Sequence, residues 1–207
     1  MTAVATWTLP KPWKIPREWD NERCFVLCSG ESIGPQAGAI KKLRGRFIAV
    51  KHAVFLKPDA DVLFVTGDGD SEILPLLKAY TGPHALVRSK VRPSMDSFNI
   101  KRIARAKDHS TLCELRDHVS GRDAGTSAIN LAYHFGATEI VLLGYDMRGG
   151  HYCPHPNQNP RQDEFRNHVE FLHQYAADAK KKGLRIVNCS PTTAVTAFEK
   201  QPLEAFL

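Results

Sequence analysis

Two carboxylates stand two residues apart, Asp68 and Asp70, directly after the apolar run DVLFV. Carboxylates at the end of a buried strand can chelate a divalent ion such as Mg²⁺, which commonly bridges the phosphates of a nucleotide. Asp70 also precedes the helical pattern SEILPLL, and aspartate is a preferred residue at the start of a helix. The spacing therefore leaves two interpretations open, a Mg²⁺ site and a helix N-cap.

Two histidines and a cysteine stand close together in HYCPHP, residues 151–156. A structural zinc site normally needs four ligands, and no second pair stands at a suitable spacing, which disfavours zinc. His155 lies between two prolines that restrict its backbone, and an unperturbed imidazole is largely neutral at pH 7. His155 is therefore the candidate general base, and His151 is expected to matter much less. The alternative for His155 is an ordinary surface histidine.

Phosphate-binding chemistry is expected in the loop that follows the apolar run CFVLC. This loop reads Ser29-Gly30-Glu31-Ser32, so it offers a glycine backbone and the hydroxyls of Ser29 and Ser32. Backbone N–H groups at the start of a helix commonly contact phosphate. The loop matches neither of the two common glycine-rich nucleotide fingerprints, so an ordinary turn between a strand and a helix stays open.

Short apolar runs alternate with helical patterns along the chain, and this alternation predicts an α/β protein. The expected fold is Rossmann-like, with three α/β/α layers and a mostly parallel sheet. Because ligands of such sheets bind at the carboxyl ends of the strands, the loops above should converge there. The expected strands are Cys24–Cys28, Phe47–Val50, Asp61–Val65, Ala85–Val87, Glu139–Leu143 and Leu184–Asn188. The expected helices are Ser32–Leu43, Ser71–Tyr80, Gly125–Phe135, Arg161–Lys182 and a short one near Ala194–Phe198.

The length of 207 residues fits one domain over residues 23–207, preceded by an N-terminal arm over residues 1–22. The arm is expected to pack Trp7, Trp13 and Trp19 onto the domain. Residues 89–122 lack a clear periodicity and are expected to be irregular, as a lid over a site would be.

The composition excludes a disordered chain, because 43% of the residues are apolar and 24% are charged. No apolar run approaches the ~20 residues that span a bilayer, and the N-terminus lacks the pattern of a signal peptide, so a cytoplasmic location is expected. The cysteines are expected to be free thiols, with Cys28 and Cys189 buried. The net charge of +6 fits a nucleotide, an anionic acceptor or nucleic acid as partner, and it fits a solvated surface equally well.

The segment from Ala124-Gly125-Thr126 through GATEIVLLGYDM resembles the SGV…LGYKEIYLSGIDF stretch of the bacterial sialyltransferases of glycosyltransferase family 42. The resemblance continues in HYCPHPN against HYIGHSK, in CSPTTAVTAF against CPNSLLANF, and in SGESI against NGPSL. It extends to the DUF115 group, which includes motility accessory factors and archaeal hydroxymethylpterin pyrophosphokinases. Phage and prophage proteins related to that group resemble this chain most in length. The resemblance covers about Cys24–Phe198, with the middle third poorly aligned.

The resemblance implies a site for a nucleotide-sugar donor, CMP-linked or other, and a catalytic base at His155. The implied nucleotide-binding and phosphate-binding positions are Ser29, Gly30, Ser32, Lys51, Ala124, Gly125, Thr126, Ser190 and Thr192. Two family asparagines are replaced by Ser29 and Lys51, and a family serine by Ala124. A lysine can still neutralise phosphate charge. Gly30 and Gly125 are expected to allow close approach to phosphate, so bulky replacements should weaken nucleotide binding without unfolding the protein.

Three functions remain open on the sequence. The leading one is transfer of a sugar from a nucleotide-activated donor to an acceptor hydroxyl, with His155 removing the proton. The second is pyrophosphoryl transfer from ATP, with Asp68 and Asp70 holding Mg²⁺. The third is a catalytically inactive protein that binds a nucleotide or nucleic acid, which the basic stretch Lys90–Lys107 favours. The oligomeric state is left open.

Overall fold

The computed structural model describes residues 8–67, 69–88, 91–153 and 162–207, and their strands form one parallel sheet. Its nine strands lie in the order β6-β5-β4-β3-β2-β1-β7-β8-β9, and every neighbouring pair is parallel. The predicted Rossmann-like α/β fold is therefore confirmed. The strands are β1 (Arg23–Leu27), β2 (Arg46–Val50), β3 (Val62–Val65), β4 (His84–Arg88), β5 (Ile100–Arg105), β6 (His118–Val119), β7 (Glu139–Leu143), β8 (Arg185–Asn188) and β9 (Glu199–Lys200).

The central strands are apolar throughout because both faces of the sheet are covered. In β1, Cys24 and Val26 face one hydrophobic core, and Phe25 and Leu27 face the other. A strand between two cores needs apolar side chains at every position, and for this reason runs such as CFVLC show no polar alternation.

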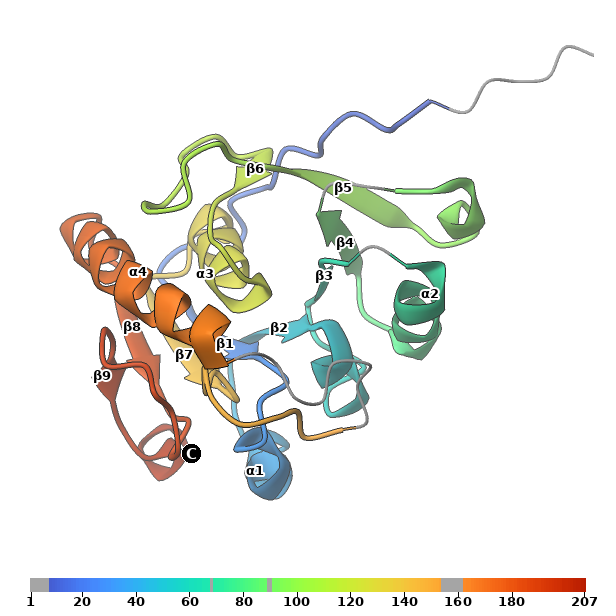
Figure 1. Cartoon of the computed structure of the whole chain (residues 1–207). Coiled ribbons are helices and arrows are strands. Elements are labelled where there is room, and N and C mark those ends of the chain that lie inside the picture. Colours follow the sequence, from blue (N-terminus) through green and yellow to red (C-terminus); the bar gives the residue numbers. More distant parts are fainter. Residues whose placement is uncertain (1–7, 68, 89–90, 154–161) are drawn as a thin grey trace, which may run out of the picture.

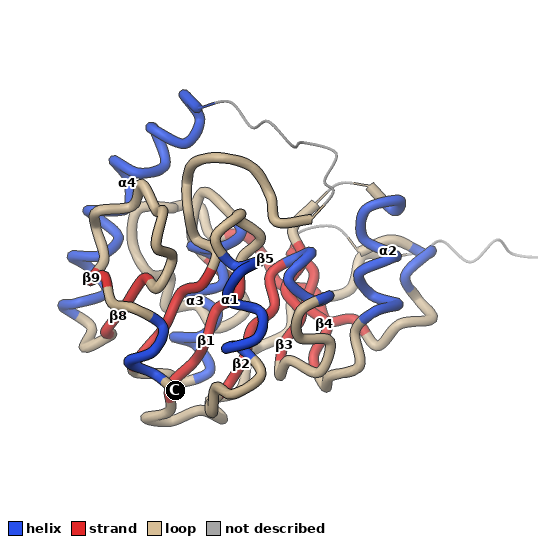
Figure 2. The backbone as a smooth tube through the Cα atoms, turned by 90° about the horizontal axis from the view of Figure 1, so that it is seen from below, coloured by secondary structure: helices blue, strands red, loops and turns tan. Residues whose placement is uncertain are grey.

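Helices cover the sheet on both sides and make three layers (Figure 1). Helices α3 and α4 pack on one face together with the N-terminal arm, whereas α1, α2, η1 and η3 pack on the other. Figure 2, turned by 90°, shows α1 in front of the centre of the sheet. The helices are α1 (Ile33–Ile40), η1 (Lys51–Phe55), α2 (Asp70–Ala79), η2 (Pro93–Met95), α3 (Ala124–Phe135), α4 (Gln162–Lys181) and η3 (Leu203–Phe206). None of the helices in the described part of the chain is long and apolar enough to cross a membrane.

The N-terminal arm contacts the domain from Pro10 onward, where the carbonyl of Pro10 accepts a hydrogen bond from Arg102. Trp19 is buried and stacks on Phe135 of α3, with ring centroids 4.1 Å apart. Trp13 donates its backbone N–H to the carbonyl of Arg102 in β5. Trp7 lies outside the described residues.

The segment after β4 contains two strands that the sequence pattern did not indicate. Strand β5 pairs with β4, and β6 pairs with β5. Strand β5 reads IKRIAR, which is too polar for a strand between two cores. Its polar residues are accommodated by the arm, because the ammonium group of Lys101 lies 4.1 Å from the centroid of the Trp13 ring.

The helix expected near Ala194–Phe198 is absent, and that prediction was wrong. The backbone N–H of Ala194 donates to the carbonyl of Asp146, and that of Val195 donates to the hydroxyl of Thr193. Because these amides are bound to the loop after β7 and to a side chain, they cannot form helical hydrogen bonds. The chain continues instead into the short edge strand β9.

The order of the sheet reverses between β1 and β7. From β1 the chain crosses by α1 to β2 on one side, and from β7 it crosses by α4 to β8 on the other side. The two connections leave in opposite directions, so they open a crevice outside the carboxyl ends of β1 and β7. In open α/β sheets this is the place where ligands bind.

Gly30 allows the two turns at this reversal to pack against each other. A Cβ atom at Gly30 would lie 2.4 Å from Oδ2 of Asp146 and 2.6 Å from the carbonyl oxygen of Gly144. A Cβ at Gly125 would similarly lie 2.4 Å from the Tyr145 ring. Both glycines are therefore required by packing within the protein, so we expect replacing them to lower stability as well as to affect ligand binding.

We predict that Gly30→Ala destabilises the fold by about 1–3 kcal/mol, the usual cost of overpacking. The matched control is Gly38→Ala in α1, where a Cβ would meet nothing within 4 Å. That change should be neutral or stabilising by up to about 1 kcal/mol, because alanine favours a helix. Urea unfolding of both variants measures the difference. Equal stabilities of the two variants would contradict the packing argument.

Candidate functional site

A cavity of about 280 Å³ opens at the reversal of the sheet. Its walls come from the loop after β1, the end of β2, the start of α3 and the loop after β7. The lining residues are Cys28, Ser29, Gly30, Val50, Lys51, Asp123, Ala124, Gly125, Gly144, Tyr145, Asp146, Met147, Arg148, Gly150, His151 and Phe165. These segments are far apart in the sequence and meet because parallel strands end at the same edge.

Five of the residues expected at the phosphate site line this cavity together: Ser29, Gly30, Lys51, Ala124 and Gly125. The structure thus brings together the segments that sequence reasoning selected on separate grounds. Binding of an anion between them stays a prediction.

Three other expected site residues are buried in structural hydrogen bonds beside the cavity. Ser32 donates its backbone N–H and its hydroxyl to the carboxylate of Asp146. The hydroxyl of Thr126 donates to Asp123, and that of Ser190 accepts the backbone N–H of Tyr145. These residues hold the loops in place and do not line the cavity.

The proposed metal ligands are Asp68 and Asp70, and the proposed base is His155. Asp68 and His155 both lie outside the described residues. Asp70 is the first residue of α2, and its carboxylate accepts hydrogen bonds from Arg92 and Ser94, at 2.7 Å each. Within the described part of the chain, no group of three or more His, Cys, Asp and Glu side chains is placed to hold a metal ion. The Mg²⁺ site therefore stays a prediction.

The N-terminus of α3 forms part of the cavity wall. Asp123 caps this helix by accepting the backbone N–H of Thr126, and Thr126 completes a capping box. Ala124 and Gly125 are the first two helical residues, and the amides at these positions have no partner within a helix. Together with the helix dipole, such amides favour a bound anion.

Lys51 is presented by a strained backbone at the end of β2. Its φ of 50° lies in the left-handed region, which is unfavourable for a side chain other than glycine. Its ammonium group lies 2.5 Å from Oε1 of Glu72 in α2. The lysine therefore already has a carboxylate partner. An anion in the cavity would either bind Lys51 together with Glu72 or replace Glu72 as its partner.

His151, which the sequence analysis expected to matter less than His155, lines the cavity. Its backbone pairs with Gly30 in an antiparallel bridge, and its Nδ1 lies 3.3 Å from the hydroxyl oxygen of Ser29. The next residue, Tyr152, donates its N–H to the carbonyl of Ser29 and its hydroxyl to the carbonyl of His52. The loop after β7 thus folds back over the loop after β1 and carries an imidazole into the site.

Tyr145 and Asp146 were missed by sequence reasoning, although they directly follow the strand EIVLL. Burial, together with the charge of Asp123, raises the pKa of Tyr145 well above its usual value. Tyr145 therefore stays protonated, and its hydroxyl donates a hydrogen bond to the carboxylate of Asp123. This excludes Tyr145 as a proton acceptor near neutral pH.

A larger cavity of about 860 Å³ adjoins the first and shares Asp146, Met147, Arg148 and Phe165 with it. Thr192, expected from the sequence to line a nucleotide, lies in its wall, as do Val169 of α4 and Glu31. The wall of the larger cavity combines the apolar side chains of Phe165 and Val169 with charged ones, among them Glu31, Arg148 and Glu170. The larger cavity alone has the size of sites that hold small-molecule ligands.

No protein-family model matches the sequence, and comparison with curated proteins gives no match. Similarity is found in structure. The MAf glycosyltransferase from Magnetospirillum magneticum AMB-1 matches with a TM-score of 0.64 and 13% identity, over 95% of this chain and 37% of that one. The sialyltransferase CST-II in complex with a trisaccharide acceptor and CMP matches with a TM-score of 0.52 and 12% identity, over 86% and 85%.

A further structure, of the sialyltransferase CstII from Campylobacter jejuni in complex with cytidine-5'-monophosphate, has a TM-score of 0.50 and 11% identity, over 87% of this chain and 85% of that one. At these identities the likeness shows a shared fold. The chain spans little more than a third of the length of the MAf glycosyltransferase.

We predict that Lys51→Gln weakens nucleotide binding by roughly tenfold, the usual loss when a charge-assisted hydrogen bond is removed. The matched control is Lys42→Gln, an exposed lysine just after α1. Calorimetric titration should use whichever of the CMP-, UDP-, GDP- and ADP-linked ligands raises the unfolding temperature most. Equal affinities in the two variants would show that Lys51 does not contact the phosphate.

Proposed function

We propose that this chain is a glycosyltransferase that moves a sugar from a nucleotide-activated donor to an acceptor hydroxyl. One observation supports this most. A cavity with helix amides, a lysine and an imidazole lies at the reversal of the sheet, in a fold shared with glycosyltransferases. The fold alone would not support the proposal, because proteins that share one fold can catalyse many different reactions.

The donor phosphate is proposed to bind at the smaller cavity. The amides of Ala124 and Gly125, the hydroxyl of Ser29 and the ammonium group of Lys51 are the groups that would contact it there. The nucleoside would extend into the larger cavity, along Phe165 and Thr192. The CST-II structure holds CMP, which supports a nucleotide-linked donor for the present chain as well.

In the proposed reaction an imidazole of the loop after β7 takes the proton of the acceptor hydroxyl. The acceptor oxygen then bonds to the anomeric carbon, and the bond from that carbon to the phosphate oxygen breaks. The nucleotide leaves with both electrons of the broken bond, and its new negative charge is stabilised by the amides of α3 and by Lys51. His155 is the proposed base, and His151 is the imidazole that already stands beside Ser29.

The nucleic-acid alternative has less support, because three cations of the basic stretch make contacts within the protein. Arg92 is paired with Asp70, and Lys101 lies over Trp13 and beside His84. Arg102 donates to the carbonyl of Pro10 in the arm. These cations are thus held by the protein itself, and a nucleic acid would have to compete for them.

We predict that His155→Ala lowers turnover by roughly 10²–10⁴-fold, the usual contribution of a general base, and leaves nucleotide affinity nearly unchanged. Release of free nucleotide from a nucleotide sugar measures turnover. The matched control is His173→Ala, because His173 is exposed on α4 and its imidazole pairs with the hydroxyl of Thr196.

The variant His151→Ala tests the competing assignment in the same assay. A loss confined to His151→Ala would move the role of base to His151. Wild-type turnover in both variants would overturn histidine catalysis. ATP-dependent release of AMP that requires Mg²⁺ would favour the pyrophosphokinase instead.

A further inference from the structure

The backbone around His151 is fastened to the loop after β1, so its imidazole has a fixed place in the wall of the smaller cavity. Gly150 donates its N–H to Oε1 of Glu31 at 2.9 Å, and the backbone of His151 itself pairs with Gly30. On the other side, Tyr152 donates its N–H to the carbonyl before Gly30 at 3.1 Å. A side chain carried by a backbone that is bound on both sides loses little freedom when a ligand arrives, as a catalytic group requires.

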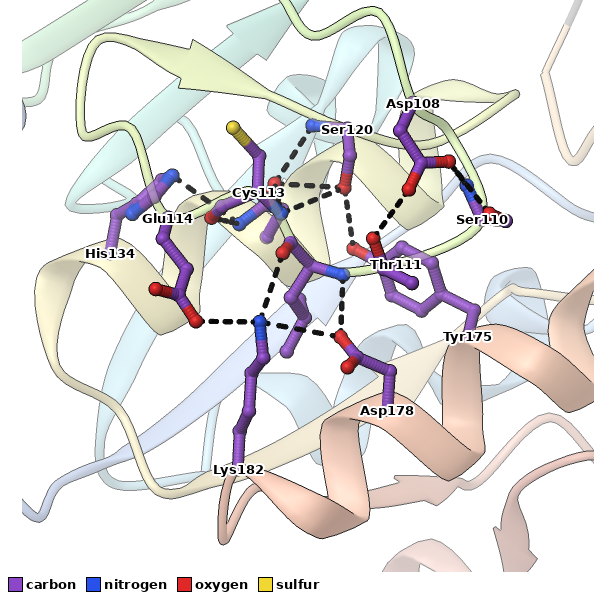
Figure 3. A network of polar contacts seen from close by, with 12 residues as sticks. Asp108, Ser110, Thr111, Cys113, Glu114, Ser120, His134, Tyr175, Asp178 and Lys182 are labelled. Atoms are coloured by element: carbon purple, nitrogen blue, oxygen red, sulfur yellow. Dashed lines mark hydrogen bonds and ion pairs between the residues drawn. The ribbon is translucent and has the colours of Figure 1, made fainter.

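The start of α3, which forms another part of this wall, is fixed as well. Tyr175 of α4 donates its hydroxyl to the carbonyl of Thr126 in the first turn of α3, at 3.2 Å. Figure 3 shows the polar network that continues from Tyr175 to Ser120, whose hydroxyls lie 3.5 Å apart. In the same network, Asp178 and Lys182 of α4 bind the loop before β6. The cavity is therefore preorganised between anchored segments.

His151 shares the cavity with all the groups that are proposed to bind the donor phosphate. Tyr152 donates its hydroxyl to the carbonyl of His52 at 2.6 Å, and His52 directly follows Lys51. The hydroxyl oxygen of Ser29 lies 3.3 Å from Nδ1 of His151. Because a hydroxyl can accept one hydrogen bond and donate another, Ser29 can accept from Nδ1–H and donate to a phosphate oxygen. The imidazole thus belongs to the phosphate end of the proposed donor site.

An imidazole at the phosphate end of the donor cannot also serve the acceptor hydroxyl. In an in-line displacement the attacking and departing oxygens lie on opposite faces of the anomeric carbon, so the base and the acid stand on opposite sides of the sugar. Negative charge develops on the departing phosphate oxygen, and a proton donor placed there lowers the barrier. The position of His151 therefore fits an acid at the leaving group and does not fit the base.

We propose that His151 is the general acid that protonates the departing phosphate oxygen of the donor, and that Ser29 positions it. This role rests on the proposed function. The bond from the anomeric carbon to the phosphate oxygen breaks, its electron pair stays on that oxygen, and the oxygen takes the proton of Nε2 of His151. The acceptor oxygen bonds to the anomeric carbon and gives its proton to the base, proposed to be His155. His151 then regains a proton from water and the base releases one to water, which restores both imidazoles.

The pH dependence of turnover distinguishes an acid from a base. An acid must carry its proton, so its contribution is complete below the pKa of its imidazole and is lost as the pH rises above it, whereas a base shows the opposite dependence. The charged and titratable side chains of the described residues around His151 come from five segments: the loop after β1, the end of β2, α2, the start of α3 and its own loop. They are Cys28, Glu31, Lys51, His52, Glu72, Asp123, Tyr145, Asp146, Arg148, Tyr152 and Cys153.

The neighbours that titrate above neutral pH do not obscure this dependence. Burial raises the pKa of Cys28, Tyr145, Tyr152 and Cys153 above their usual values, so these groups stay protonated near neutral pH. Burial, and then the charge of Lys51, lower the pKa of His52, which therefore loses its proton at a lower pH than an ordinary histidine. A fall in turnover just above neutral pH is thus expected from His151.

Release of free nucleotide from a nucleotide sugar, measured across the neutral pH range, tests the acid role. We expect His151→Gln to lower kcat by roughly 10²–10⁴-fold and to remove the fall on the alkaline side of the profile, with the acid side unchanged. Ser29→Ala leaves the imidazole in place, so it should lower kcat by only about tenfold and keep the alkaline fall. The matched control, His173→Gln on the exposed side of α4, should keep the wild-type profile.

Side-chain NMR of the protein labelled with ¹⁵N-histidine, titrated with inorganic pyrophosphate at constant ionic strength, tests the phosphate contact without turnover. Because a nearby anion favours the charged form of an imidazole, the ring nitrogens of His151 should shift toward those of an imidazolium. The ring nitrogens of His173 should not shift. The signal of His151 is the one that is lost in His151→Gln.

Three results would overturn the proposal. A His151 imidazole that does not respond to pyrophosphate would remove it from the phosphate. Loss of the acid side of the profile in His151→Gln would make His151 the base. An alkaline fall that persists in His151→Gln would assign that fall to another group.

Failure of the proposed function would look different. If no nucleotide sugar is turned over and pyrophosphate still protonates His151, the glycosyltransferase proposal fails and the phosphate contact of His151 stands. If wild-type turnover is observed and His151→Gln keeps the full wild-type profile, only the acid role is wrong.

Discussion

The buried carboxylate of Asp146 joins the turn after β7 to the start of α1, and the candidate site is built around this contact. It accepts the backbone N–H of Ser32 at 2.9 Å and its hydroxyl at 2.5 Å. Beside it, the N–H of Gly30 donates to the carbonyl of Gly144 at 2.9 Å. These bonds close the two turns on each other where the sheet reverses.

Backbone strain is concentrated at the same place. Among the described residues, three other than glycine have a positive φ, and two of them, Lys51 and Met147, line the smaller cavity at φ 50°. Each such residue costs of order 1–3 kcal/mol and persists only where the surrounding packing enforces it. Strain of this kind is typical of ligand sites. The strained backbone directs a side chain toward the ligand, where a relaxed backbone would direct it elsewhere.

The sequence predicted the elements well where residues are buried between two cores, as in CFVLC and EIVLL. It failed for β5, because the polar run IKRIAR is stabilised by an arm that lies more than 80 residues away in sequence. It also selected Ser29, Gly30, Lys51 and Gly125 correctly as neighbours, because carboxyl ends of parallel strands must meet. The roles of Ser32, Thr126 and Ser190 were less predictable. A hydroxyl near a site can form a hydrogen bond with a ligand or with a neighbouring loop, and only three-dimensional contacts distinguish the two roles.

Strands β1 and β7 are neighbours in space, and the ion pair between Arg23 and Glu139 at their start spans 116 positions of sequence. This pairing cannot form until β7 has been synthesised. Closing the long loop between the two strands then costs conformational entropy. One wall of the crevice follows β1 and the other follows β7. An N-terminal fragment that ends before β7 would therefore lack the second wall. A ligand that bridges both walls binds the folded state alone. Its presence would therefore slow the separation of the two halves and protect the central strands from exchange with solvent.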